Sequence, residues 1–177
     1  IELGGKFPRN PGTTKFLLER FNLKMPTGWY GALLRERSVK EEWQAMQDQL
    51  NLLKLVNADV FMFADVSGSI QGDGSIQLSK RPKLNKDDWI DYCNKINEIA
   101  NMLMDEGMPI SYHEHMGTII QSEEDVDKFM DMTNENTFLL YDTGHLMFAK
   151  ANYEKILKNH ISRINHVHCK DIRKDVL

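Results

Sequence analysis

The sequence has little cysteine and no long apolar run. Its two cysteines, Cys93 and Cys169, lack the paired spacing of a zinc motif or a disulfide framework. This usage fits a reducing compartment and predicts a cytoplasmic protein. No apolar stretch approaches the roughly 20 residues that a membrane-spanning helix needs, so we expect no membrane partner.

A stripe rich in lysine and arginine is also missing. The 22 basic and 26 acidic side chains give a net charge of −4, which is opposite to the charge expected of a nucleic-acid-binding protein. We therefore expect no nucleic-acid partner. The segment 67–73 contains glycines but lacks the lysine of a phosphate-binding loop, so nucleotide binding is not expected either. The oligomeric state stays open, a homo-oligomer included.

What the chain does contain is a concentration of histidine. Five of its six histidines lie in the segments Tyr112–His115, Tyr141–His145 and His166–Asp171, each of which ends an apolar run. Imidazole and carboxylate groups bind divalent ions and move protons near neutral pH. A lone histidine at a strand end is more often a hydrogen-bonded structural residue, but three such segments favour a metal or acid–base site. His160 follows a helical pattern and is set aside.

Short apolar runs alternate with helical patterns along the chain, which predicts a parallel sheet with helices outside it. Capping boxes at Ser38, Asn85 and Ser122 predict three helix starts, and residues 152–157 indicate a shorter helix. No linker divides the chain, so residues 1–177 are expected to form a single domain. The expected strands are residues 1–3, 23–25, 59–64, 110–113, 138–142 and 164–168.

Residues capable of chemistry follow four or five of these strands. An open doubly wound sheet and a closed (β/α) barrel both place their sites at the carboxyl ends of strands, but only a barrel brings every strand to one mouth. The sequence therefore favours an α/β fold of the (β/α)8 TIM-barrel type. A whole barrel needs about 250 residues, so we expect a partial barrel that lacks the first strand and the last strand and helix.

Strand parity brings candidate metal ligands to one face. Alternate side chains of a strand share a face, which puts His113 with His115 and His166 with His168. Asp142, which ends the intervening strand, can then meet His113 and His168. Histidine and carboxylate ligands suit Mn²⁺, Fe²⁺, Co²⁺ or Zn²⁺, and the lack of paired thiolates argues against a closed structural zinc site.

Along its whole length the chain resembles the inosose dehydratases, within the xylose-isomerase-like barrel superfamily. The most specific segments are residues 112–118, Tyr-His-Glu-His-Met-Gly-Thr, and residues 68–73, Gly-Ser-Ile-Gln-Gly-Asp. The segments Asp142–Leu146 and His166–Asp171 are similar to sequences found across the superfamily. The opening segment Ile1–Arg9 also resembles the corresponding part of these dehydratases.

The resemblance implies a metal-dependent hydro-lyase of inositol catabolism. Its substrate would be a small polyol ketone, 2-keto-myo-inositol (scyllo-inosose), which it would dehydrate to a trihydroxycyclohexane-dione through an enediolate stabilised by Mn²⁺ or Co²⁺. Asp142 and His168 match the ligand positions of the sixth and seventh barrel strands. The fifth-strand position falls on His113 by strand parity, with Glu114 as the alternative. An eighth-strand glutamate has no counterpart before Leu177.

The resemblance also implies roles for residues around this metal site. Either His115 or His145 would handle one proton and Lys170 the other. From the residues alone, Trp29 and Tyr30 could stack against a ligand or close the edge of the barrel, and packing is the expected role. The residues expected to bind the substrate are Glu2, Lys6, Asp171 and Arg173.

Three rival functions remain. A sugar or inositol isomerase or epimerase would use the same enediolate and return the proton elsewhere. An abasic-site endonuclease of this superfamily would need a basic groove, which the net charge of −4 disfavours. A non-catalytic polyol-binding module is a further alternative, against which the intact Asp142, His145 and His168 argue.

Overall fold

The computed structural model describes residues 1–173, within which five parallel strands form one sheet. Each strand lies beside its neighbour in the sequence, in the spatial order β1 to β5. The switch point of an open doubly wound sheet is therefore absent from the described sheet, which instead has the strand order of part of a barrel wall. The strands are β1 (Tyr30–Ala32), β2 (Phe61–Asp65), β3 (Ile110–His113), β4 (Thr137–Asp142) and β5 (Ile164–His168).

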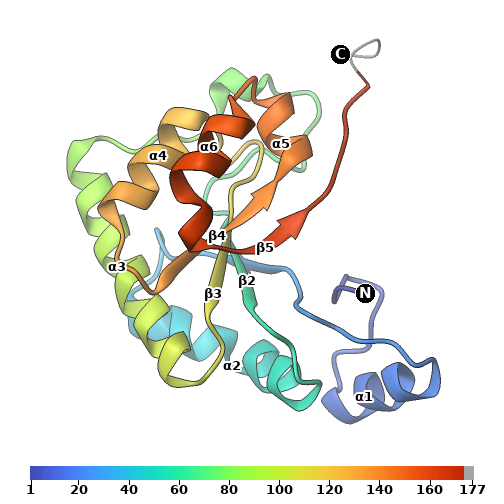
Figure 1. Ribbon diagram of the computed structural model, residues 1–177. Coiled ribbons are helices and arrows are strands. Elements are labelled where there is room, and N and C mark those ends of the chain that lie inside the picture. Colours follow the sequence, from blue (N-terminus) through green and yellow to red (C-terminus); the bar gives the residue numbers. More distant parts are fainter. Residues whose placement is uncertain (174–177) are drawn as a thin grey trace.

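Helices cover the outer side of this sheet. In Figure 1, α3, α4 and α6 lie along one side of the strands, whereas the N-terminal segment lies on the other. Within residues 1–173, no helix combines the length and the apolarity that crossing a membrane would require. The helices are α1 (Pro11–Arg20), α2 (Val39–Leu55), α3 (Lys86–Asp105), α4 (Glu123–Met132), α5 (Thr143–Phe148) and α6 (Tyr153–His160), with 3-10 turns at Leu78–Lys80 (η1) and Ile161–Arg163 (η2).

Side-chain caps start the helices where the sequence predicted them. Reciprocal capping boxes at Ser38, Asn85 and Ser122 begin α2, α3 and α4. The helix α1 was not predicted, although Asn10 caps it and Pro11 occupies its first turn. The six-residue α5 was also not predicted. Asp142, a predicted metal ligand, caps it by accepting a hydrogen bond from the backbone nitrogen of His145 at 3.0 Å.

The first two predicted strands are wrong. Residues 1–3 contribute only an isolated bridge between Leu3 and Gly28, and residues 23–25 belong to no strand. The chain joins the sheet later, at Tyr30. Pro26 lies between residues 23–25 and β1, and it has no N–H to donate to a neighbouring strand. Its carbonyl oxygen accepts hydrogen bonds from the backbone nitrogens of Asp59 and Val60 at 2.8 and 3.2 Å.

Successive side chains of each strand point to opposite faces of the sheet, so core residues lie on one face and site residues on the other. Phe61, Phe63, Ile110, Tyr112 and Leu139 belong to the buried cluster that includes the helix side chains. The residues between them face the inner side of the sheet. Because parallel strands end at the same edge, the polar residues that close β2 to β5 gather there. The predicted domain also includes residues 174–177, which lie outside the described residues.

Candidate functional site

His113, Asp142 and His145 converge at the carboxyl ends of β3 and β4. One ligand atom from each lies within 4.8 Å of the other two, and all three residues are buried. His113 Nε2 is 3.6 Å from Asp142 Oδ2, and His145 Nε2 is 3.9 Å from the same oxygen. These distances exceed those of hydrogen bonds, so neither ring nitrogen is hydrogen-bonded to this carboxylate oxygen. This group could hold a divalent cation.

An irregularity in β5 brings His168 to the same carboxylate. Leu139 pairs with Ile164 but Leu140 pairs with His166, so Asn165 is an extra residue in β5. Asp142 consequently lies opposite His168, and His168 Nδ1 donates to Asp142 Oδ2 at 3.1 Å. Without the extra residue Val167 would lie there, because a one-residue slip exchanges the two faces of a strand.

A second group forms around Glu2. Glu2 Oε1 accepts hydrogen bonds from His166 Nε2 at 2.7 Å and from His168 Nε2 at 2.9 Å. These hydrogen bonds hold the pKa of Glu2 well below its usual range. Hydrogen bonds to Asp142 and Glu2 raise the pKa of His168 to about 9. His168 thus joins the two groups, with one carboxylate at each ring nitrogen.

Burial sets the protonation states around Asp142. Burial, followed by repulsion from His145 and His115, holds the pKa of His113 well below its usual range. Burial also lowers the pKa of His145 to about 4. The pKa of Asp142 is raised by burial, but hydrogen bonds from His168 and Lys170 outweigh this and hold it well below its usual range. At neutral pH the rings of His113 and His145 are therefore neutral and Asp142 is ionised, which are the forms that bind metal. His168 carries both ring protons and must release the one on Nδ1 to bind a metal ion.

Buried polar atoms without partners mark the same place. Among the described residues, His113 Nδ1 and Glu114 Oε2 have no hydrogen-bond partner, and they lie 3.6 Å apart. The other oxygen of Glu114 accepts from the backbone nitrogen of Asp142 at 3.3 Å. The candidate group thus contains His113, and Glu114 lies beside its other ring nitrogen. The choice of His113 over Glu114 as a ligand stays a prediction. The donor set and the orphaned atoms together fit a divalent ion.

Lys170 reaches this site from the segment after β5. Its Nζ contacts Asp142 Oδ2 and lies 3.2 Å from His145 Nε2. Thr143 anchors the backbone of Lys170 through its hydroxyl. Gly144 leaves room for the lysine, since a Cβ there would lie 2.5 Å from Lys170 Cβ. Thr143 and Gly144 were not predicted to have a role in the site, although both lie in the Asp-Thr-Gly-His segment.

His115 lies at the edge of the cluster, beside a cavity. Its ring packs edge-on against His145 at 4.3 Å and against Trp29 at 5.2 Å between ring centroids, and Trp29 also contacts His113. The cavity measures about 250 Å³ and is lined in part by His115, Met116 and Phe148. A larger cavity of about 470 Å³ lies between α1 and the end of α2 and contains none of these histidines.

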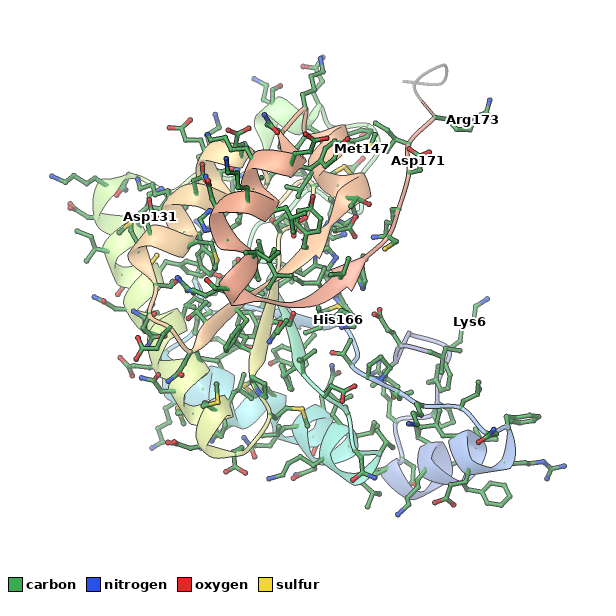
Figure 2. All side chains as sticks on the ribbon, in the orientation of Figure 1. Lys6, Asp131, Met147, His166, Asp171 and Arg173 are labelled. Atoms are coloured by element: carbon green, nitrogen blue, oxygen red, sulfur yellow. The ribbon has the colours of Figure 1, made fainter. Side chains whose placement is uncertain are left out.

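Three predicted substrate-binding residues lie outside the cluster. Figure 2 shows Lys6 on the N-terminal segment pointing away from β5, and Asp171 and Arg173 on the segment that leaves the sheet after β5. All three are exposed. Asp171 Oδ1 accepts from the backbone nitrogen of Ile172 at 2.7 Å. Their substrate-binding roles stay predictions.

Comparisons with known proteins confirm the predicted resemblance. A family model described as xylose isomerase-like TIM barrel matches residues 14–176. The rhizopine catabolism protein MocC of Rhizobium meliloti is 39% identical over 99% of this chain and 54% of its own length. Inosose dehydratase 2 of Bacillus cereus is 36% identical over 99% of this chain and 60% of its own length. The chain thus spans less than two thirds of these relatives.

A solved structure supports the barrel fold independently. The probable 3-DHS dehydratase AsbF of Bacillus anthracis superimposes with a TM-score of 0.70 at 14% sequence identity. The match covers 91% of this chain and 57% of that protein. At this identity the likeness bears on the fold alone.

Proposed function

Because the chain belongs to the xylose isomerase-like TIM barrel family, we propose that its site dehydrates 2-keto-myo-inositol with the help of a divalent metal ion. The observation that carries the proposal is the similarity to proteins named inosose dehydratase over nearly the whole chain. The segments that carry the resemblance also supply His113, Asp142 and Lys170. The chain spans 59–60% of the length of those relatives, so the activity is proposed for the whole protein.

His113, Asp142 and His168, the positions that the resemblance implies, would hold the ion. His145 Nε2 lies 3.9 Å from Asp142 Oδ2. Histidine nitrogen and carboxylate oxygen suit Mn²⁺ or Co²⁺, which we propose as the ion. When bound, the ion would act as a Lewis acid toward the ketone oxygen and so acidify the neighbouring C–H.

His115 is the proposed base for that C–H proton. Its Nδ1 lies 3.0 Å from the carbonyl oxygen of Met116, and because a carbonyl can only accept, Nδ1 carries the hydrogen. The lone pair is therefore on Nε2. Burial lowers the pKa of His115, which keeps the ring neutral and able to accept a proton. The cavity beside His115 would receive the substrate ring.

Lys170 is the proposed acid for the leaving hydroxide. As the C–O bond breaks with its electron pair, a proton from Lys170 Nζ converts the departing hydroxide to water. The electrons of the broken C–H bond form the new carbon–carbon double bond. His145 Nε2, 3.2 Å from Lys170 Nζ, accepts a hydrogen bond from the ammonium group and orients it.

The test is turnover of 2-keto-myo-inositol by the full-length protein with Mn²⁺, Co²⁺ or a chelator, followed by the ultraviolet absorbance of the dione. Asp142→Ala should abolish both metal binding and activity. His115→Gln should keep the metal and lower kcat by about 10²–10⁴-fold, which is the usual contribution of a general base. His160→Gln is the matched control, because His160 bonds to Asp127 outside the site.

Chelator-sensitive formation of the dione would establish the dehydratase. Full activity of Asp142→Ala would refute the assigned site. Stoichiometric metal binding without dione formation would refute the reaction and favour an isomerase or epimerase acting on another polyol.

A further inference from the structure

Glu2 connects the N-terminal segment to the far end of the described chain. Its carboxylate accepts from His166 Nε2 at 2.7 Å and from His168 Nε2 at 2.9 and 3.1 Å. Figure 2 shows His166 on β5, toward the side where the N-terminal segment with Lys6 lies. Glu2 was predicted to bind the substrate, but in the structure both of its oxygens face histidines.

The opposite nitrogen of His168 faces the candidate metal site. His168 Nδ1 lies 3.1 Å from Asp142 Oδ2, and Asp142 belongs to the buried group with His113. A metal-binding histidine commonly donates its other ring N–H to a carboxylate, which fixes the ring orientation and makes the ligand nitrogen more basic. Glu2 has the position that this arrangement requires.

We propose that Glu2 is a positioning residue for the metal site: it holds the Nε2–H of His168 so that Nδ1 points to the ion beside Asp142. This inference rests on the proposed metal-dependent function. His166 supports it from the other side, because its hydrogen bond fixes Oε1 of Glu2.

The alternative is that Glu2, His166 and His168 themselves bind an ion, since their ligand atoms lie within 4.8 Å of one another. Hydrogen bonding and burial favour the outer-shell role. Glu2 Oε1 already accepts hydrogen bonds from both histidines, at 2.7 and 2.9 Å. The group around Asp142 is the fully buried one, and it contains the unpartnered Nδ1 atom of His113.

The experiment measures Mn²⁺ affinity and stoichiometry in the full-length protein by competition with a chelating indicator. Glu2→Gln should weaken Mn²⁺ binding by about 10–100-fold, the usual cost of losing an outer-shell partner. Glu2→Asp keeps the charge but is one methylene shorter, so it should also bind weakly. It provides a second test if Glu2→Gln folds poorly. Glu36→Gln is the control, because Glu36 is exposed and far from these histidines in the sequence.

A double-mutant cycle tests whether Glu2 acts through His168. In a His168→Asn background, Glu2→Gln should cause no further loss of affinity, because the ring it orients is gone. An equal loss in both backgrounds, or wild-type affinity in Glu2→Gln, would overturn the inference. Two ions per chain, one of them lost in Glu2→Gln, would show instead that Glu2 is itself a ligand and would also overturn it.

Measuring Mn²⁺ binding and dione formation separately distinguishes a failure of the proposed role of Glu2 from a failure of the proposed reaction. Normal Mn²⁺ binding by the wild type and by Glu2→Gln refutes the role of Glu2 and leaves the dehydratase proposal intact. Mn²⁺ binding weakened by Glu2→Gln in a protein that forms no dione supports the role of Glu2 and refutes the reaction. A wild-type protein that binds no divalent ion overturns both.

Discussion

Thr143 and Lys170 are joined by two hydrogen bonds. The Thr143 hydroxyl donates to the carbonyl oxygen of Lys170 at 2.5 Å and accepts from the backbone nitrogen of Lys170 at 2.9 Å. Thr143 follows Asp142 directly, so the turn that presents the carboxylate also fixes the segment after β5. These two bonds fix the backbone of Lys170, and this position lets its ammonium group contact Asp142.

Thr143→Val should therefore displace Lys170 while keeping the shape of the side chain. We expect kcat to fall by about 10²-fold, the cost of misplacing a catalytic group by about 1 Å, with KM little changed. Thr143→Ser retains the hydroxyl and should keep most of the activity. The measurement is steady-state dehydration of 2-keto-myo-inositol with bound metal checked in each variant. Equal kcat values for the valine and serine variants would contradict the role of the hydroxyl.

Gly144 gives a steric test of the same contact. A Cβ at this position would lie 2.5 Å from Lys170 Cβ and 3.5 Å from Asp142 Oδ1. The lysine Cβ is fixed to its backbone, so the segment after β5 must move. Gly144→Ala should lower the free energy of unfolding by about 1–3 kcal/mol, as overpacking does, and should lower kcat as well. Urea unfolding and turnover measure the two effects.

Gly12→Ala is the control for this substitution. Its added Cβ would meet only Asn10 Oδ1, at 3.4 Å, which is ordinary contact. Within α1 alanine is favoured over glycine by about 1 kcal/mol, so this variant should be as stable as the wild type or more stable. Loss of activity in Gly12→Ala, or none in Gly144→Ala, would contradict the steric argument.

The carboxyl ends of β3 to β5 could be predicted from the sequence because each is a short apolar run closed by polar residues. The predicted bounds of β3 and β5 agree with the structure, and β4 begins one residue earlier, at Thr137. The buried cluster of His113 and Asp142 follows from strand parity alone. Local pattern therefore sufficed for the part of the site built from consecutive strands.

Other features depend on contacts that no local pattern contains. The extra residue Asn165 in β5 depends on the register with β4, which the β5 sequence alone does not specify. The contact between Glu2 and His166 joins residues 164 positions apart. The start of the sheet at Tyr30 depends on how Pro26 meets the chain before β2. These arrangements are set by tertiary packing.

Arg163 provides a prediction about stability rather than activity. Its guanidinium donates to the carbonyl oxygens of Thr137 at 2.9 Å and Met130 at 2.6 Å, and to the Thr133 hydroxyl at 2.8 Å. The end of α4 is thus tied to the start of β4. A lysine keeps the charge but cannot reproduce the planar set of donors. Arg163→Lys should therefore lower the free energy of unfolding by about 1–3 kcal/mol, as expected when buried acceptors lose their donors.

Urea unfolding measures this effect, with Arg20→Lys at the exposed end of α1 as the control. The control should stay within about 0.5 kcal/mol of the wild type, as surface substitutions usually do. Mn²⁺ affinity should be unchanged in both variants, because Arg163 lies at the amino end of β5. Equal stability of the two variants would show that the Arg163 contacts contribute nothing specific.

The last prediction concerns Asp127, which joins α4 to α6. Asp127 Oδ1 accepts from His160 Nε2 at 2.6 Å, and Oδ2 lies 3.5 Å from Lys155 Nζ. Burial raises the pKa of Asp127, but hydrogen bonds and attraction from His160 and Lys155 outweigh it and lower the pKa overall. An acid whose pKa is lowered by folding binds fewer protons in the folded than in the unfolded chain. Its stabilising contribution is therefore present above its unfolded pKa of about 3.9 and is lost as the pH falls through the folded value.

Asp127→Asn should accordingly be less stable than the wild type at pH 5, and the difference should shrink as the pH falls toward 3. Urea unfolding at several pH values in this window measures it. At each pH, subtracting the free energy of unfolding of the variant from that of the wild type cancels the contributions of the other carboxylates. Asp48→Asn, at an exposed position of α2, is the control and should show little difference at any of these pH values. A difference for Asp127→Asn that stays constant or grows on acidification would mean that its ionised form does not stabilise the contact between α4 and α6.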